Sequence, residues 1–393
     1  MGIDRVLWVT MAYPSEGNPV PGIFYQTQAE ALVRLGVQVE VVAPTPWVPW
    51  PLARCSRRWA AYRRIAERYE HGGVQIYRPR YPALPNEVLC GAPHWFMTQA
   101  IAQLGLTPPQ LIHAHYAYPC GLVAGQLRRR WQIPAVLTLH GSDVNVNPTV
   151  NALTRHYFAA ATSEADQVIA VSRPLAERAE CLTGRLPVVL PLGIDTRRYA
   201  RLPEKEAARR ALHLPADAFL IVFVGNLLAA KGIRELLSAL ERLAVESYRA
   251  VFIGDGPLRR EIDAAPRAIA VGAQPNELIP QYLAAGDVLV LPSYGEGMPT
   301  VLIEAGMAGL PVIASQVGGS ADLLAGERGV LIPDHSVDAL VAAIRAVRAD
   351  YPAALTRTRA LQTFVRHEYD VEANARKLLE IYAESAARFH RQA

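Results

Sequence analysis

The sequence predicts an α/β fold made of two doubly wound domains, each built on a parallel sheet. Short apolar runs alternate with amphipathic helical patterns along almost the whole chain. Strands this apolar, when helices separate them, are typical of parallel sheets that are covered on both faces. The chain has 393 residues, and a single hydrophobic core stops growing at about 250–300 residues. We therefore expect two domains of roughly equal size.

Most of the expected strands are separated by a helical pattern. The clearest pattern is the spacing of Ile233, Leu236, Leu237, Leu240 and Leu243, which puts one face of a helix in a core. In chain order, we expect strands at Val6–Val9, Val37–Val42, Leu111–Ala114, Ala135–Leu139, Val168–Val171, Leu220–Val224, Arg249–Ile253, Ala268–Val271, Val288–Leu291, Val312–Ala314 and Val330–Ile332.

The alternation of strands and helices pauses in a charged stretch between residues 191–195 and Pro215. We place the domain boundary there, which gives an N-terminal domain over residues 1–197 and a C-terminal domain over residues 198–370. The tail, residues 371–393, has the apolar spacing of a helix. Ligands of doubly wound sheets bind beyond the carboxyl ends of the strands, and small-molecule sites favour clefts between domains. We expect the site in such a cleft.

The composition favours a soluble, cytoplasmic protein. No apolar run approaches the ~20 residues that cross a bilayer, and the first residues lack the pattern of a secretory signal. The cysteines, Cys55, Cys90, Cys120 and Cys181, lie far apart in the sequence. Neither a disulfide framework nor a zinc site is therefore expected, which fits a reducing compartment.

A strand, a glycine-containing loop and a helix follow one another over residues 289–306. The strand ends at Leu291, and we expect the helix to begin near Pro299. The N-terminus of such a helix directs free N–H groups and the positive end of its dipole at the strand edge, where phosphate commonly binds. Glu296 and Glu304 would face the same place, and carboxylates accept hydrogen bonds from hydroxyl pairs of ribose or hexose. The alternative is a loop glutamate and a helix glutamate without a ligand.

Lys231 follows another buried strand and a glycine turn that contains Asn226. A cation near a helix N-terminus is unfavourable because it opposes the helix dipole, and a bound anion beside it would offset this unfavourable interaction. The simpler alternative is a lysine that contacts only solvent. Further glycine turns follow two strands, at Gly254-Asp255-Gly256-Pro257 and Val317-Gly318-Gly319. The first strand is not followed by G-x-G-x-x-G, and the sequence has no P-loop. Dinucleotide oxidoreductases and P-loop NTPases are therefore not favoured.

In the first half, Gly22 lies in a loop after the first strand, and His113, His115 and His140 lie at the ends of later strands, with Asp143 close behind. Such residues can bind a metal, but the spacing of a metal site is missing, so we expect no metal. We expect His140 to hydrogen-bond a substrate, whereas His113 and His115 can equally be structural. The sequence has no nucleophile elbow for acyl transfer and no obvious pair of glycosidase carboxylates.

The sequence resembles the retaining GT-B nucleotide-sugar glycosyltransferases of glycosyltransferase family 4. The resemblance extends over nearly the whole chain, and its most specific part is Glu296-Gly-Met-Pro followed by Glu304-Ala-Gly-Met-Ala-Gly-Leu-Pro-Val. It implies a GT-B fold, in which two Rossmann-like domains face each other across a cleft and a C-terminal helix crosses back to the first domain. The motifs that carry it occur in the order found in that family: Gly22, His140-Gly-Ser-Asp, Asn226, Lys231-Gly232, Gly254-Asp-Gly-Pro, Glu296 and Glu304.

The resemblance implies how the donor nucleotide is bound. Lys231, with backbone N–H groups near Thr300 and Val301, would neutralise the donor diphosphate. Glu304 would bind the ribose hydroxyls, and Gly22 would let the first loop approach the phosphates.

The resemblance also implies how the donor sugar is held. Glu296 and the backbone of Gly297, Met298 and Pro299 would bind the sugar, and His140 would contact it near the reacting centre. The family retains anomeric configuration without a metal, by same-face attack in which the leaving phosphate assists as base. The enzyme would then stabilise that phosphate electrostatically. No cofactor is expected, and the implied catalytic residues are His140, Lys231 and Glu296.

One residue departs from the family pattern. Asn226 stands where the family usually has an arginine, so one cation at the diphosphate is missing. Asn226 and Gly254, which each follow an expected strand, remain expected donor-binding residues.

We therefore predict a metal-independent, retaining enzyme that moves a hexose-type sugar from a nucleoside diphosphate to a glycan or lipid-linked acceptor. Within the family, the similarity favours bacterial cell-surface polysaccharide assembly, such as that of teichuronic acid or capsule. Asn226 favours one alternative, a catalytically weak nucleotide-sugar-binding subunit that supports a partner. A GT-B-fold nucleotide-sugar epimerase is another.

The net charge of +4 comes from one segment. Residues 54–68 contain six arginines and one glutamate, and Trp47 and Trp50 precede them. Arginines beside aromatic groups suit an anionic membrane surface, here over residues 47–68, or a lipid-linked acceptor; a solvated helix with extended arginines is an equally good interpretation. Nucleic acid is not expected, because no binding motif accompanies the patch. The first interpretation places the protein peripherally on the inner face of the cell membrane.

Overall fold

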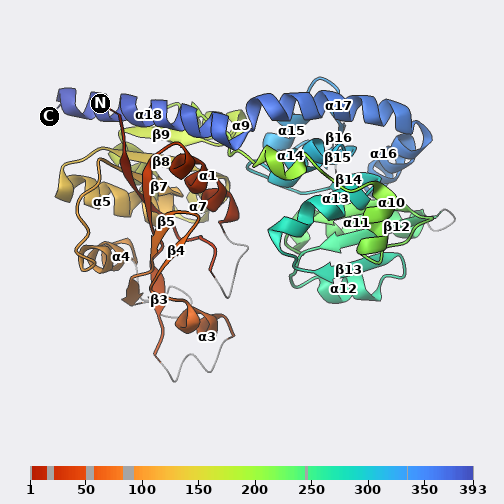
Figure 1. Cartoon of the computed structure of the whole chain (residues 1–393), viewed down its shortest axis with the longest axis horizontal. Coiled ribbons are helices and arrows are strands. Elements are labelled where there is room, and N and C mark those ends of the chain that lie inside the picture. The colour runs from red at the N-terminus through yellow and green to blue at the C-terminus, as the bar shows by residue number, and fades with distance from the viewer. Residues whose placement is uncertain are drawn as a thin grey trace. The chain divides into compact units, whose positions relative to one another are not determined.

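A computed structural model of the chain describes residues 2–15, 22–49, 57–82, 93–243, 247–333 and 335–392. These residues form two compact units (Figure 1). The first unit comprises residues 1–193 and 371–393, and the second comprises residues 194–370. The chain therefore passes to the second unit after Gly193, a few residues before the boundary expected from the sequence, and returns to the first at Val371.

The first unit contains a large sheet and a small one. The large sheet has the order β10-β9-β8-β7-β1-β2-β5-β4, and β3 pairs with β6 in the small sheet. Neighbouring strands are parallel except β4 and β5, which form a hairpin around Gly72-Gly73. The bounds are β1 (Arg5–Val9), β2 (Gln38–Val42), β3 (Thr45–Trp47), β4 (Arg68–His71), β5 (Val74–Tyr77), β6 (Arg80–Pro82), β7 (Leu111–His115), β8 (Ala135–Leu139), β9 (Gln167–Ala170) and β10 (Val188–Val189).

The helices of the first unit include the last one of the chain, α18, which packs against α1 (Figure 1). Tyr382 of α18 is fully buried, and its hydroxyl accepts a hydrogen bond from Trp8 Nε1 at 3.1 Å. Asn374 Nδ2 donates to the carbonyl oxygen of Pro191 at 3.1 Å. The bounds are α1 (Ile23–Arg34), α3 (Arg57–Arg64), α4 (Pro93–Ala102), α5 (Leu122–Trp131), α6 (Ser142–Asn145), α7 (Asn147–Val150), α8 (Ala152–Glu164), α9 (Arg173–Thr183) and α18 (Val371–Gln392).

The second unit is built on a parallel sheet with the order β13-β12-β11-β14-β15-β16. The predicted amphipathic helix is α11, whose Ile233, Leu236 and Leu240 are buried. The strands are β11 (Phe219–Val224), β12 (Tyr248–Ile253), β13 (Ala268–Gly272), β14 (Val288–Leu291), β15 (Val312–Ser315) and β16 (Val330–Ile332). The helices are α10 (Lys205–Ala211), α11 (Ile233–Arg242), α12 (Arg259–Ala264), α13 (Ile279–Ala285), α14 (Thr300–Ala308), α15 (Gly319–Leu324), α16 (Val337–Ala349) and α17 (Tyr351–Glu368).

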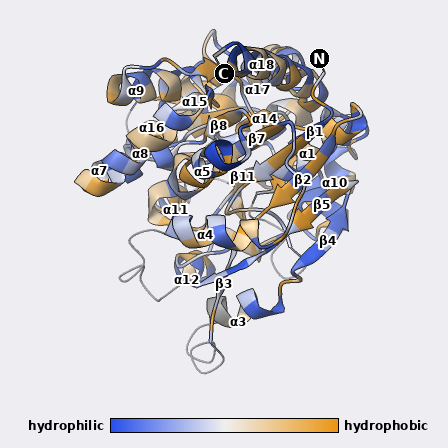
Figure 2. Ribbon diagram, turned by 90° about the vertical axis from the view of Figure 1, so that its left-hand side faces the viewer, coloured by the Kyte–Doolittle hydropathy of each residue, from blue (hydrophilic) through white to orange (hydrophobic). Residues whose placement is uncertain are grey.

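The predicted α/β class with parallel sheets is confirmed, and every expected strand is present to within a residue at each end. The strands that sequence analysis missed are short or carry polar residues. Figure 2 illustrates the contrast, because the predicted strands β1 and β2 are largely hydrophobic whereas the missed edge strand β4 is hydrophilic. Across the described ranges, the structure contains no helix of the length and hydropathy needed to span a bilayer.

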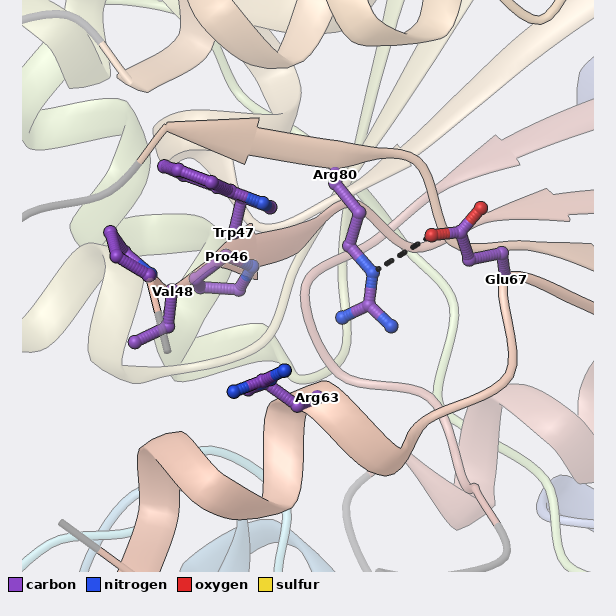
Figure 3. A pocket seen from close by; sticks show the side chains of 7 residues that line it. Pro46, Trp47, Val48, Arg63, Glu67 and Arg80 are labelled. Atoms are coloured by element: carbon purple, nitrogen blue, oxygen red, sulfur yellow. Dashed lines mark ion pairs between the residues drawn. The ribbon is translucent and has the colours of Figure 1, made fainter. Parts of the chain in front are cut away.

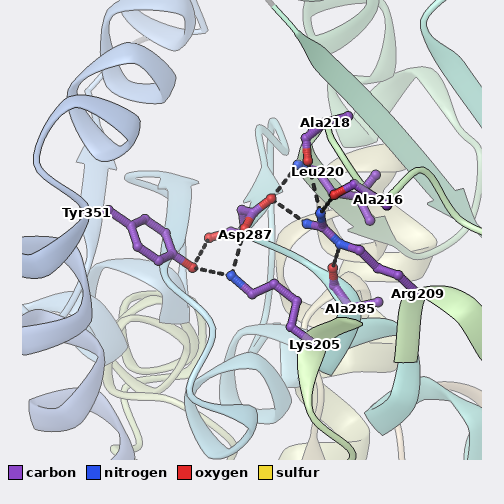
Figure 4. Close-up of polar contacts among 8 residues, drawn as sticks. All are labelled: Lys205, Arg209, Ala216, Ala218, Leu220, Ala285, Asp287 and Tyr351. Atoms are coloured by element: carbon purple, nitrogen blue, oxygen red, sulfur yellow. Dashed lines mark hydrogen bonds and ion pairs between the residues drawn. The ribbon is translucent and has the colours of Figure 1, made fainter. Parts of the chain in front are cut away.

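A buried ion-pair network fixes the start of β14 in the second unit (Figure 4). The carboxylate of Asp287 accepts hydrogen bonds from Lys205 Nζ at 2.7 Å and from Arg209 Nη2 at 2.6 Å. The backbone N–H of Leu220 also donates to this carboxylate, at 2.7 Å. The Arg209 and Asp287 side chains are only 7% and 12% exposed. The network therefore ties α10 to β11 and β14, the two central strands of this sheet.

We predict that Asp287→Ala lowers the free energy of unfolding by about 3–5 kcal/mol, because it leaves the buried Arg209 guanidinium without its counter-charge. Urea unfolding followed by far-ultraviolet circular dichroism measures the change. The matched control is Asp263→Ala, which removes an exposed pair with Arg259 and should cost less than about 1 kcal/mol. Equal losses in the two variants would show that the Asp287 network is not a determinant of stability.

Candidate functional site

Two loops of the second unit leave adjacent strands at the point where the strand order reverses. β11 lies between β12 and β14, and later strands are added outward on both sides. Open α/β sheets bind ligands at such a switch point, beyond the carboxyl ends of the strands. The loop after β11 carries Lys231, and the loop after β14 carries Glu296.

Lys231 and Glu296 form an ion pair, with Nζ 2.6 Å from Oε1. Lys231 ends a short 3₁₀ turn before α11, and Gly232 follows with φ 69°. A Cβ at Gly232 would lie 2.0 Å from the carbonyl oxygen of Pro292, so only glycine allows the two loops to touch. Sequence analysis proposed the two charged residues separately, and the structure brings them together. Their side chains are 26% and 10% exposed, so a ligand can reach the pair.

The first turn of α14 lies next along the same loop. The helix begins at Thr300, and Pro299 is its N-cap, so the start lies within one residue of the expected one. The N–H groups of Thr300 and Val301 belong to the first turn, where a helix offers no acceptor. They are therefore suited to an oxyanion.

The glycine turn before α15 holds this loop in place. The backbone N–H of Gly319 donates to the carbonyl oxygen of Gly297 at 2.9 Å. A Cβ at Gly318 would lie 1.8 Å from the carbonyl oxygen of Glu296, and one at Gly319 would lie 2.7 Å from Met298 Cε. Residues without a side chain thus let the loop after β15 pack against the segment from Glu296 to Met298.

Asn226 and Gly254 follow β11 and β12. The Asn226 side chain is exposed and forms no hydrogen bond with any residue in the described ranges. Gly254 has φ 145°, and a Cβ there would lie 1.9 Å from the carbonyl oxygen of Gly225. The two turns therefore lie against each other, as two neighbouring ligand-binding loops would.

Glu304 is 7% exposed on α14, and its Oε1 accepts a hydrogen bond from the hydroxyl of Tyr199 at 3.0 Å. Burial raises the pKa of the Glu304 carboxyl, and the Tyr199 hydrogen bond and the charge of Arg198 oppose this shift. A carboxylate accepts several hydrogen bonds, so Glu304 retains the capacity to bind a ligand. Sequence analysis missed Tyr199, because it lies 105 residues from Glu304 and no local spacing connects the two.

In the first unit, Asp143 organises the turn that follows β8. Its Oδ1 accepts hydrogen bonds from the backbone N–H groups of His140 at 3.0 Å and Gly141 at 2.8 Å. Burial raises the pKa of Asp143, and these hydrogen bonds oppose the shift. The His140 ring lies with Nε2 3.1 Å from Nδ1 of His115. The His140-Gly-Ser-Asp motif is thus a self-bonded turn that fixes the position of His140.

Gly22 is the N-cap of α1 in the first unit, with φ 79°. A Cβ there would lie 2.3 Å from the carbonyl oxygen of Ala12. Because Gly22 has no Cβ, the start of α1 can lie against the segment that follows β1.

His113 belongs to a buried chain of hydrogen bonds. Its Nδ1 lies 2.6 Å from the Tyr382 hydroxyl and its Nε2 lies 2.7 Å from Thr138 Oγ1. Burial lowers the pKa of His113 and that of His140 to about 3, and it lowers the pKa of His115 well below the usual value. The three rings are therefore neutral at pH 7. His113 is structural, whereas His140, whose ring contacts His115, follows β8 at the carboxyl edge of the sheet.

Within the described ranges, no three His, Cys, Asp or Glu side chains form a group that could hold a metal ion.

The basic segment is described only in part. Residues 50–56 lie outside the described ranges, and so do the side chains of residues 57–59. Arg63 and Arg64 are exposed at the end of α3, and Trp47 is 55% exposed at the end of β3. The described part thus presents an indole and two guanidinium groups to solvent.

Two α/β units built on mostly parallel sheets, one of which has charged residues and a helix N-terminus at its switch point, are the architecture of GT-B glycosyltransferases. Family models match both halves: Glycosyltransferase Family 4 over residues 22–198 and Glycosyl transferases group 1 over residues 218–350. TuaC of Bacillus subtilis strain 168, a candidate glycosyltransferase of teichuronic acid biosynthesis, is 40% identical over 345 residues, which cover 86% of this chain and 88% of TuaC. The chain therefore belongs to glycosyltransferase family 4 and is a glycosyltransferase.

Solved structures confirm the GT-B fold. Sucrose-phosphate synthase from Thermosynechococcus elongatus matches with a TM-score of 0.81 at 24% identity, over 98% of this chain and 100% of that one. Anabaena HepE, in complex with UDP-glucose, matches with a TM-score of 0.75 at 19% identity, over 97% of this chain and 99% of HepE.

We predict that acidification destabilises the first unit through His113. Its pKa is about 3 in the folded protein and about 6.5 when unfolded. Between these values the unfolded state binds a proton that the native state does not, so stability falls as pH falls. The loss from His113 between pH 7 and pH 5 is about 2 kcal/mol, and His113→Gln should remove it. All 6 tryptophans belong to the first unit, so tryptophan fluorescence during urea unfolding measures its stability.

The control for this prediction is His156→Gln, which changes an exposed histidine and should keep the pH dependence of the wild type. An unchanged pH dependence in His113→Gln would contradict the assignment of a neutral, buried His113.

Proposed function

We propose that this protein transfers a sugar from a nucleoside diphosphate to a glycan or lipid-linked acceptor, with retention of anomeric configuration. The observation that carries the proposal is the Lys231–Glu296 ion pair at the switch point of the second unit. In a nucleotide sugar, one oxygen joins the anomeric carbon to the diphosphate. A carboxylate and an ammonium in contact therefore suit the two sides of the bond that breaks.

The donor diphosphate would bind to Lys231 and to the N–H groups of Thr300 and Val301. These groups are fixed before the reaction, so they stabilise the charge that develops on the leaving phosphate. When the bond between the anomeric carbon and the phosphate oxygen breaks, its electron pair stays on that oxygen. The acceptor oxygen attacks from the same face, and its proton passes to the leaving phosphate. The positive charge comes from the protein in this scheme, and no metal is required.

Further residues of the second unit would make the remaining donor contacts. Glu304, oriented by Tyr199, would accept hydrogen bonds from the ribose hydroxyls. Glu296 and the backbone from Gly297 to Pro299 would bind the sugar hydroxyls. Gly254 would let the turn after β12 approach the donor.

The first unit would contribute two residues. His140 is neutral at pH 7 because burial lowers its pKa to about 3, so it would act as a hydrogen-bond partner of the sugar, not as a cation. Gly22 would admit the donor phosphates to the start of α1.

We also propose that the reaction belongs to cell-surface polysaccharide assembly at the inner face of the membrane. The name of TuaC, which refers to teichuronic acid biosynthesis, supports this assignment. Residues 47–68 would hold the protein on anionic lipid as a cytoplasmic, peripheral protein through arginines that lie outside the recess described below, such as the exposed Arg64, because exposed arginines bind such surfaces.

Asn226 favours a second candidate function, a nucleotide-sugar-binding subunit with little activity of its own. Its amide carries no charge, so the diphosphate would bind one cation fewer than in most family members. This candidate would bind the donor as the enzyme does, so the turnover rate, and not the affinity, distinguishes the two functions.

We predict that Lys231→Ala and Glu304→Gln each weaken binding of the donor nucleotide about tenfold to hundredfold, because each removes a charge-assisted hydrogen bond. A thermal-shift panel of UDP-, GDP- and ADP-glucose identifies the base, since ligands stabilise the native state by mass action. Calorimetry with the corresponding nucleoside diphosphate then measures affinity. Lys377→Ala and Glu241→Ala change exposed residues and should bind as the wild type does. Unchanged affinity in Lys231→Ala and Glu304→Gln would refute this site.

We predict that the wild type slowly hydrolyses its donor in the absence of acceptor and that Glu296→Ala reduces the rate about 100-fold or more, as expected for loss of transition-state stabilisation. Nuclear magnetic resonance of the product should show the anomeric configuration of the donor, and a chelator should not change the rate. Equal background rates in wild type and variant, with intact donor binding, would identify the binding subunit. An epimerised nucleotide sugar would identify an epimerase.

A further inference from the structure

A recess in the first unit has a volume of about 310 Å³ and combines an apolar wall with two guanidinium groups. Figure 3 shows Pro46, Trp47 and Val48 on one side, Arg80 with Glu67 on the other, and Arg63 below. We propose that this recess binds an anionic sugar of the acceptor. The sugar ring lies against Trp47, and its carboxylate or phosphate binds Arg63. The assignment of this sugar to the acceptor rests on the proposed function, whereas the binding of an anionic sugar does not.

The fold places this recess on the substrate side of the first sheet. β3 begins shortly after the carboxyl end of β2, and β6 begins shortly after that of β5. Hydrogen bonds from Ala43 N to Tyr77 O and from Thr45 N to Pro79 O, both 2.9 Å, join these extensions. His140 follows the carboxyl end of β8 in the same, mostly parallel, sheet. Ligands bind at that edge in α/β proteins.

The apolar wall offers the surface that a sugar ring needs. Trp47 is 55% exposed although it is among the largest apolar side chains of the unit. One face of a pyranose presents C–H groups, and these pack against aromatic rings, while its hydroxyls stay in water. An indole fixed at the end of a strand loses little conformational freedom when it binds such a face.

The two arginines of the recess are not equivalent. Arg80 donates from Nη1 to the carbonyl oxygen of Tyr62 and from Nη2 to that of Ile65, both at 2.6 Å, and its Nε lies 3.5 Å from Glu67. It therefore holds the end of α3 against β6. Arg63 is exposed and has no hydrogen bond or ion pair with any described residue. Its planar fork is free to bind a carboxylate or a phosphate in bidentate geometry.

The shape of the site favours a sugar over a lipid surface. Trp47 and Arg63 face the same concave space, whereas groups that anchor a protein on a bilayer need to project from it. The Glu67 carboxylate, which is 74% exposed at the rim, offsets part of the positive charge and weakens attraction to a continuous anionic surface. A sugar ring that carries one anionic group can pack against the apolar wall and bind Arg63 at the same time.

The proposal is tested by calorimetry of the full chain with three probes. A hyaluronan tetrasaccharide supplies carboxylates, glucose 6-phosphate supplies a phosphate, and isomaltotetraose is neutral. At least one anionic probe should bind at least about tenfold more tightly than isomaltotetraose. Trp47→Ala and Arg63→Gln should each weaken that binding about tenfold. Arg64→Gln and Trp95→Ala, which change exposed residues outside the recess, should not.

The proposal is wrong if neither anionic probe binds more tightly than isomaltotetraose, or if the two control variants lose as much affinity as the recess variants. Flotation with vesicles of phosphatidylcholine and phosphatidylglycerol tests the lipid surface. Loss of flotation in Trp47→Ala and Arg63→Gln, with unchanged affinity for the anionic probe, would assign the recess to the membrane. Donor binding involves the second unit and is measured separately, so failure of the proposed function would leave sugar binding intact, and the reverse also holds.

Discussion

The contact between Gly232 and the carbonyl oxygen of Pro292 is the constraint on which the site of the second unit depends. Since a Cβ at Gly232 would lie 2.0 Å from that oxygen, any other residue would force the loops after β11 and β14 apart. Separation of the loops would break the Lys231–Glu296 pair and move Lys231 away from the first turn of α14. A backbone contact thus controls the spacing between Lys231, from the loop after β11, and the two groups that the loop after β14 supplies.

Burial sets the charge state of the side chains around this geometry. The Asp287 carboxylate accepts hydrogen bonds from two cations and a backbone N–H, so it joins the central strands without remaining unpaired in the interior. His113, His115 and His140 of the first unit are kept neutral, because burial lowers their pKa values. Glu304 is intermediate, since burial raises its pKa while Tyr199 and Arg198 oppose the shift.

Sequence analysis predicted the apolar strands and the glycine-containing loops that follow them. Buried parallel strands such as β8 are continuous apolar runs, so they were predicted to within a residue. β3 and β6 were missed because they are three residues long and β6 contains an arginine; the recess at Trp47 was missed with them. The loops of Lys231 and Glu296 were predicted, but their ion pair was not, because side-chain contact depends on strand order. Tyr199 had no signal, because its partner lies 105 residues away.

In the proposed reaction, the Lys231–Glu296 pair would also connect recognition of the sugar with stabilisation of the leaving phosphate. The pair has no net charge, so a diphosphate would gain little from Lys231 while Glu296 holds it. Sugar hydroxyls that donate to Glu296 would weaken that hold and release the ammonium toward the phosphate. Asn226 adds no cation, so this release would matter more here than where an arginine is present. A donor that lacks the correct hydroxyls would leave the ion pair closed. With the correct donor, binding energy from the sugar would be used where charge develops in the transition state.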